Sequence, residues 1–246
     1  MASQLAKLQS ALAALLMEPA KLEMFQANAK AYARRAGLSG KDAVLLAGLP
    51  PEGAAYFASR RVIDRYHYLD GDVPRSVAAI DATVGLAATY FTDRPYAKED
   101  PRAEVRQFRA WATAAAKSGR IPAPLGDLAT LEATGMLLMD KPHRKPVRSS
   151  RLRKAPGVVV LKMRHNPDQL VGAEPLSAAT GRFPTALVRE PDDVEVVTLE
   201  PVAAALVAAA SGKRTEAQVV SAFAPRFGAK AVRASLRDLR KRSILS

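Results

Sequence analysis

The chain has 246 residues and a formal net charge of +13 at pH 7, and 48% of its residues are hydrophobic. This length supports one large domain or two smaller ones, and the apolar content excludes a wholly disordered chain. The absence of cysteine excludes disulfides, thiol catalysis and sulfur-ligated metals, and it agrees with a reducing cytoplasm, where we expect the protein to reside. The charge favours acidic partners, whether nucleic acid, an acidic protein face or an acidic peptide.

No apolar run approaches the roughly 18 residues that a membrane-spanning helix needs, so we expect no membrane contact. The leucines of residues 5–16 could belong to a secretory signal. Their helical spacing, with Lys7 as the one basic residue among them, instead favours the first helix of a globular domain.

Residues 1–140 predict a helical domain. Apolar residues at helical spacing, separated by Pro and Gly, indicate seven or eight helices and no strand. We expect a single helix to carry Leu22, Phe25 and Tyr32, and another to run from Pro74 to about Tyr90. Ser39 and Asp127 are predicted N-caps, and residues 70–72 (Asp-Gly-Asp) are predicted to form a turn.

The composition then changes. Residues 141–154 contain seven Lys or Arg and no acidic residue. Such a run is usually a solvated linker, and its lack of aromatic residues argues against an arm that stacks on nucleic-acid bases. We therefore predict a helical domain at residues 1–140, a basic linker at 141–156 and a second domain at 157–246.

The second domain is predicted to contain three strands followed by three helices. Runs of β-branched residues indicate strands at 158–163, 185–189 and 194–199, the last two joined as a hairpin by Glu-Pro-Asp-Asp turn chemistry. Helices are expected at 201–210, 215–227 and 229–241, with Thr215 as an N-cap and Gly228 as a helix stop. The whole chain is thus mainly α with a small α+β domain of winged-helix-like plan.

No pattern in the chain indicates catalysis. The three histidines, His67, His143 and His165, are far apart and form no ligand-spaced set. No glycine-rich phosphate loop or nucleophile elbow is present, and no carboxylates are paired for acid–base work. We expect no enzyme activity, metal or cofactor in this chain.

The second domain has two functional interpretations. In a winged helix, the third helix enters the DNA major groove; in a peptide-recognition module, an extended peptide adds a strand to the sheet edge. The predicted hairpin precedes the helices, and few residues follow the third helix to form a late wing, which favours peptide binding. The expected peptide-binding residues are Val194, Glu195, Val196, Val197, Thr198, Arg233, Arg237 and Arg240.

The helical half resembles a known group through residues 15–25 (LLMEPAKLEMF), 37–39 (GLS), 49–53 (LPPEG) and 57–63 (FASRRVI). These segments are similar to partner proteins of multinuclear non-heme iron-dependent oxidative enzymes, which modify ribosomally made peptides. Residues 206–245 are similar to the three helices of small precursor-peptide recognition elements. The resemblance implies that iron is held by the partner enzyme and that this chain binds the precursor peptide.

The function expected from the sequence is therefore that of a non-catalytic partner. It would form a heterodimer with the oxidative enzyme, bind the precursor peptide and present it for modification during peptide natural-product biosynthesis. Arg233, Arg237 and Arg240 would favour an acidic peptide. The alternative is a winged-helix DNA-binding regulator.

Overall fold

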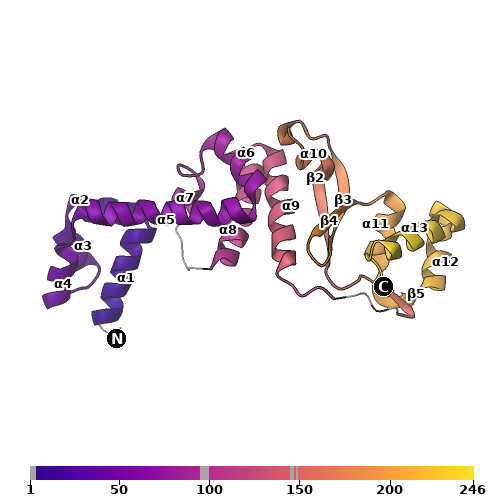
Figure 1. The fold of residues 1–246 in the computed structure, drawn as a ribbon, viewed down its shortest axis with the longest axis horizontal. Coiled ribbons are helices and arrows are strands. Elements are labelled where there is room, and N and C mark those ends of the chain that lie inside the picture. The colour runs from indigo at the N-terminus through magenta and orange to yellow at the C-terminus, as the bar shows by residue number, and fades with distance from the viewer. Residues whose placement is uncertain (1–3, 95–99, 145–146, 148) are drawn as a thin grey trace. The chain divides into compact units, whose positions relative to one another are not determined.

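The computed structural model describes residues 4–94, 100–144, 147 and 149–246, and the protein is mainly helical with two small sheets (Figure 1). Residues 145, 146 and 148 of the predicted basic linker lie outside the described residues. In the described ranges, no helix is both long and apolar enough to cross a membrane. The chain divides into two compact units, residues 1–111 (unit 1) and 112–246 (unit 2).

Unit 1 consists of helices throughout its described residues. Their bounds are α1 (Gln4–Met17), α2 (Pro19–Ala27), α3 (Ala29–Arg35), α4 (Gly40–Ala47), α5 (Pro51–Asp72), α6 (Pro74–Val84), α7 (Tyr90–Asp93) and most of α8 (Pro101–Lys117). Leu8, Leu15, Phe25 and Leu46 are buried together with Tyr32, so α1 to α4 enclose one apolar core.

Three expectations for unit 1 were wrong. The helix expected to carry Leu22, Phe25 and Tyr32 is broken at Asn28, whose side chain accepts the N–H of Ala31 at 2.9 Å and caps α3. The turn predicted at residues 70–72 is the last turn of α5, because Val73 N still bonds to Leu69 O. The helix from Pro74 ends at Val84, where Gly85 has φ 71°.

A buried polar network ties α5 to α7 and α8. Arg65 pairs with Glu104 at 3.0 Å, Tyr90 donates to Glu104 at 2.7 Å, and the guanidinium lies over the rings of Tyr90 and Phe91. Burial raises the pKa of the Tyr90 hydroxyl well above its usual value, and the Glu104 carboxylate adds to the shift. Each buried charge in this network has a partner of opposite charge, so we interpret the network as structural.

Unit 2 begins with the end of α8 and contains a three-stranded sheet. Its elements before the C-terminal helices are α9 (Ala123–Met139), β1 (Arg151–Arg153), β2 (Val158–His165), α10 (Pro167–Leu170), η1 (Pro175–Ser177), β3 (Thr180–Arg189) and β4 (Val194–Thr198). The strands β2, β3 and β4 form the antiparallel three-stranded sheet in that order, with β3 in the middle.

The three-stranded sheet confirms the predicted strands and hairpin, with longer bounds for β2 and β3. Val160 lies opposite Ala186, and Ala186 lies opposite Val197 on the next strand. Gly157, directly before β2, has φ 78°, and a Cβ there would lie 3.0 Å from the Cβ of Arg189. Any larger residue would therefore be strained at this turn into the sheet.

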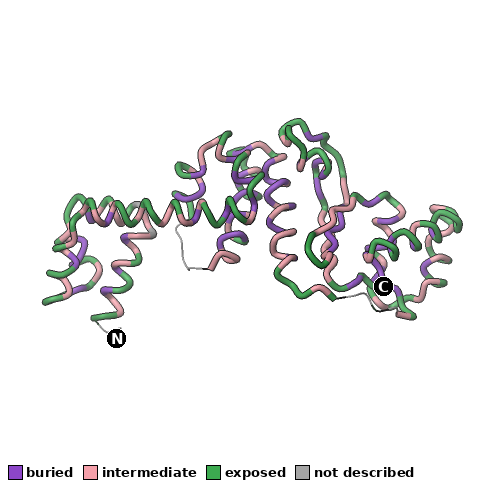
Figure 2. The backbone as a smooth tube through the Cα atoms, viewed as in Figure 1, coloured by how far each residue is buried: buried purple, intermediate pink, exposed green. Residues whose placement is uncertain are grey.

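Helices cover the two faces of the sheet. On one face α9 contacts all three strands, and on the other Ala186 and Val188 join the core of the C-terminal bundle, formed by α11 (Pro201–Ala209), α12 (Glu216–Phe227) and α13 (Ala229–Lys241). Within the sheet, the buried residues are mainly those of the middle strand β3 (Figure 2). Because α9 packs on this sheet, it belongs to unit 2, although the sequence placed it in the helical domain at residues 1–140.

The C-terminal bundle has the three predicted helices, and Thr215 forms the full capping box with Gln218. The expectation of three strands followed only by helices was incomplete. A further strand, β5 (Ser211–Thr215), lies between α11 and α12 and pairs with β1 from the basic linker. The C-terminal residues complete this arrangement, because Arg153 and Ser246 exchange two backbone hydrogen bonds of 2.9 and 3.2 Å.

Candidate functional site

The outer strand β4 presents backbone groups at an open edge. Residues of an antiparallel pair alternate between hydrogen-bonded and non-bonded positions. Leu199 N donates to Pro184 O at 2.7 Å, so Val194, Val196 and Thr198 direct their N–H and C=O groups away from β3. The N–H of Val194 already donates a hydrogen bond to the side-chain carboxylate of Asp193 at 2.6 Å. Val196 and Thr198 are therefore the residues whose main chain is open to a further strand.

Charged side chains near β4 form ion pairs with one another. Arg242, at the C-cap of α13, bonds Glu195 of β4 at 2.9 Å and Asp238 at 3.3 Å. Both members of the Arg242–Glu195 pair are about two-fifths exposed, so the pair orients α13 against β4 more than it stabilises the fold. Glu195 and Val197 face the C-terminal bundle, and Val197 packs against its core.

The structure does not bring the three predicted arginines to β4. Arg233, Arg237 and Arg240 are exposed and share one flank of α13, and Arg240 pairs with Glu216 of α12. Asp238 and Arg242 lie roughly half a turn away on the helix, on the flank that meets β4. The predicted site residues thus divide into two groups on different sides of α13.

The other outer strand, β2, is open over a longer stretch. Arg189 N donates to Gly157 O at 3.0 Å, which sets the alternation so that Val158, Val160 and Lys162 direct their backbone groups outward. In the described part of the chain β2 has β3 as its one strand partner. Beyond Lys162 the edge is closed, because Asp127 of α9 accepts the N–H groups of Arg164 and His165 at 2.9 and 3.1 Å.

A groove of about 890 Å³, here called the β2 groove, lies within unit 2 between this edge and α11. Its apolar lining comes from β2, β3 and the small side chains of α11. Four exposed cations line it as well, and no Asp or Glu does. The lining residues used below are Val160, Lys162, Arg164, Arg182, Ala208 and Lys154. In the described residues none of the four cationic side chains makes an ion pair.

The predicted cap Asp127 has a different role from the one expected. Instead of capping α9, which begins at Ala123, its carboxylate binds the end of β2 and the Nδ1 atom of His165 at 2.9 Å. His143 lies elsewhere, with Nδ1 3.1 Å from Arg189 O. Within the described ranges, no three His, Cys, Asp or Glu side chains gather where they could hold a metal ion.

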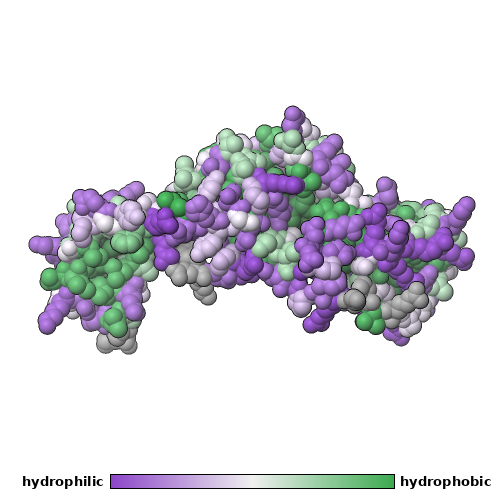
Figure 3. Space-filling model, viewed as in Figure 1, coloured by the Kyte–Doolittle hydropathy of each residue, from purple (hydrophilic) through white to green (hydrophobic). Residues whose placement is uncertain are grey.

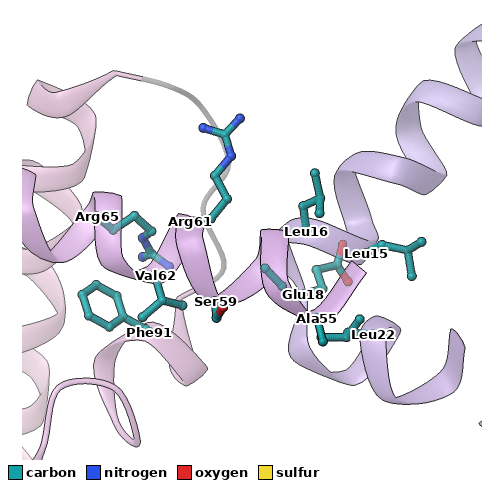
Figure 4. Close-up of a pocket in the computed structure, with 11 residues that line it drawn as sticks. Leu15, Leu16, Glu18, Leu22, Ala55, Ser59, Arg61, Val62, Arg65 and Phe91 are labelled. Atoms are coloured by element: carbon teal, nitrogen blue, oxygen red, sulfur yellow. The ribbon is translucent and has the colours of Figure 1, made fainter. Parts of the chain in front are cut away.

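Unit 1 has a small pocket and exposed apolar side chains. The pocket, of about 270 Å³, has leucines of α1 and α2 on one side and Val62, Arg65 and Phe91 on the other (Figure 4). Separately, Tyr56 and Phe57 of α5 are 65% and 60% exposed with ring centroids 5.7 Å apart, and Val44 and Leu45 of α4 are also exposed. Figure 3 shows apolar atoms gathered over the α1 to α4 end of this unit.

Sequence reasoning missed Arg242 and the β2 groove. Arg242 was visible as part of a basic helix end, but its contact with Glu195 depends on the angle at which α13 meets the sheet. The groove brings Lys154, Lys162 and Arg182 together from three separate segments. The available signal was the pattern of β2, where an apolar run gives way to the alternating cations Lys162 and Arg164.

No protein-family model matches the chain, and a search of curated proteins finds no match to it. The functional argument therefore depends on the site itself.

Proposed function

We propose that this chain is a non-catalytic partner protein that binds an extended precursor peptide and presents it to a multinuclear iron-dependent oxidative enzyme. The observation that carries the proposal is the open edge of β4, where Val196 and Thr198 direct backbone donors and acceptors outward beside α13. A peptide strand added there gains main-chain hydrogen bonds for affinity, and the flank of α13 supplies specificity. The resemblance of the helical half to such partner proteins supports the identity of the enzyme.

The winged-helix-like plan fits this use. We propose that α11, β5, α12 and α13 correspond to the helix-turn-helix part of a winged-helix-like module, and that the three-stranded sheet of the same unit provides the edge for the peptide. The peptide contacts proposed at β4 come from the backbone of Val196 and Thr198 and from Arg242, which pairs with Glu195 of β4. Arg233, Arg237 and Arg240 lie on the other flank and are not part of this contact.

The enzyme-docking surface is proposed to lie on unit 1. Tyr56 and Phe57 form an exposed aromatic pair, and aromatic side chains dominate the energetics of many interfaces. Docking by unit 1 would leave the sheet of unit 2 to hold the peptide, and tethering the peptide to the complex raises its effective concentration at the active site.

The test uses the purified full chain, the short peptide encoded beside its gene and the neighbouring oxidase. We expect a stable complex with the enzyme, and peptide binding that is lost in Val196→Pro, which removes an outward N–H that no other strand uses. Val196→Thr keeps that N–H and the side-chain volume, and should bind as the unchanged protein does. Absence of both the peptide complex and the enzyme complex would refute the proposal.

A DNA-binding regulator is the second candidate, favoured by one observation. Arg233 and Arg237 are exposed on a single flank of α13, the helix that would enter a major groove. This candidate predicts duplex binding that weakens steeply with salt and falls on Arg233→Ala or Arg237→Ala, as a gel-shift series would measure. If the chain instead binds a peptide at β4, neither substitution should change the affinity for that peptide.

A further inference from the structure

We infer that the β2 groove is a second peptide site, which takes an acidic, extended segment as an additional strand. This inference does not depend on the proposed role of β4, because it rests on the opposite edge of the sheet. Three features carry it: an open strand edge, an apolar cavity beside that edge, and cations without acidic partners around it.

The open edge supplies the main-chain contacts. Val158, Val160 and Lys162 direct their N–H and C=O groups outward, so an added strand can make up to two hydrogen bonds at each of them. The closure of the edge by Asp127 at Arg164 and His165 sets where the added strand must stop. The edge thus defines both the position and the extent of the bound segment.

The groove supplies a place for apolar side chains. Val160 lines it from β2, and Ala208, exposed on α11, lines the opposite wall. Alternate side chains of an added strand point to the same face, so every second residue of the peptide enters the space of about 890 Å³ beside α11. An apolar peptide side chain at one of these positions is buried in the groove, and that burial favours binding.

The cations determine the charge of the occupant. Lys154, Lys162, Arg164 and Arg182 surround the groove, and no carboxylate lines it. In the described residues these side chains make no ion pair, so acidic residues of a peptide would meet cations that are free to pair. The same cations oppose pairing of the β2 edges of two copies of this chain, since like charges would face each other.

The occupant is therefore a segment in which acidic and apolar residues alternate. The probe is a synthetic fluorescent peptide of alternating glutamate and valine. Its matched control alternates glutamine and valine, which keeps the shape and removes the charge. We expect the glutamate peptide to bind the full-length chain about tenfold more tightly than the glutamine peptide, because several charge pairs form at the partly exposed rim.

Two variants locate the site. Lys162→Glu with Arg164→Glu should weaken binding of the glutamate peptide about tenfold or more, and Ala208→Trp should abolish it by filling the groove. All three positions are exposed, so the fold should be retained. The control Arg233→Glu with Arg237→Glu changes the net charge by the same amount on the far flank of α13, and should alter affinity less than about twofold.

Backbone amide exchange in the bound state separates strand addition from other occupants. The inference predicts slower exchange at Val158, Val160 and Lys162 when the glutamate peptide is bound. Equal loss of affinity in both double variants, or no protection at these amides, would overturn it. Tight binding of decanoate that displaces the peptide without such protection would assign the groove to a fatty acid instead and equally overturn it.

Discussion

The two outer strands of the three-stranded sheet present similar backbone edges in different chemical surroundings. At β4 the neighbouring charges are matched, since Arg242 pairs with Glu195 and Asp238. At β2 the neighbouring cations lack acidic partners in the described residues, and an apolar groove lies beside them. Both edges are proposed to accept an added strand, so we expect the side chains around each edge to determine which peptide it binds.

The largest effect should come from the strand that the two edges share. Leu187 of β3 is 1% exposed, and Leu187→Ala should lower the free energy of unfolding by about 2–5 kcal/mol through lost burial and a cavity. Urea denaturation measures the loss, and peptide binding at both edges should weaken. Val147→Ala, at an exposed position, is the control. If peptide binding weakened at one edge alone, the two edges would not share one core.

The next effect tests whether surrounding charge makes the two edges differ. Glu195→Lys with Asp238→Lys removes both acidic partners of Arg242 and should give β4 the cationic character of β2. In the background of Lys162→Glu and Arg164→Glu, this change should restore binding of the glutamate peptide about tenfold. Protection must then appear at the Val196 and Thr198 amides. Continued weak binding would mean that the β4 edge lacks room for the peptide.

Salt should distinguish the edges to a smaller degree. Binding of the glutamate peptide at β2 should weaken several-fold between low and high salt, because exposed charge pairs are screened. Binding of the glutamine peptide should change by less than about twofold. Fluorescence anisotropy titrations of both peptides measure this difference. An equal salt response for the two peptides would remove charge from the account of the β2 groove.

The smallest effect concerns the ion pair beside β4. Arg242→Ala should change the free energy of unfolding by less than about 1 kcal/mol, because both partners of its pair with Glu195 are substantially exposed. The same variant should weaken binding of the peptide proposed for β4, while Arg237→Ala should not. Thermal denaturation and peptide titration separate these outcomes. A large loss of stability would make Arg242 a structural residue instead.

Local patterns predicted the elements well where short-range chemistry determines them. Thr215 is the N-cap of α12 and Gly228 its C-cap, as predicted, and the β-branched runs form strands. The exceptions arose from long-range contacts. No strand was predicted for β5, because its partner β1 lies in the basic linker, far away in the sequence. Residues 70–72 looked like a turn, although the α5 hydrogen bonds continue through them.

The candidate site was harder to predict for the same reason. β4 is local and was predicted, but helical periodicity alone could not show which flank of α13 faces it. The structure puts Asp238 and Arg242 there, with Arg233, Arg237 and Arg240 on another side. The β2 groove is lined by residues of β2, β3 and α11 and by Lys154, so no single stretch of sequence contains it.

The central claim is that this chain recognises peptides by adding a strand to its small sheet. Backbone amide exchange of the isotopically labelled full chain, with the peptide encoded beside its gene, tests it most directly. The account predicts that binding slows exchange at Val196 and Thr198, whose N–H groups face outward, and leaves the inward-facing N–H of Val197 unchanged. Binding without protection at Val196 and Thr198 would contradict strand addition at β4.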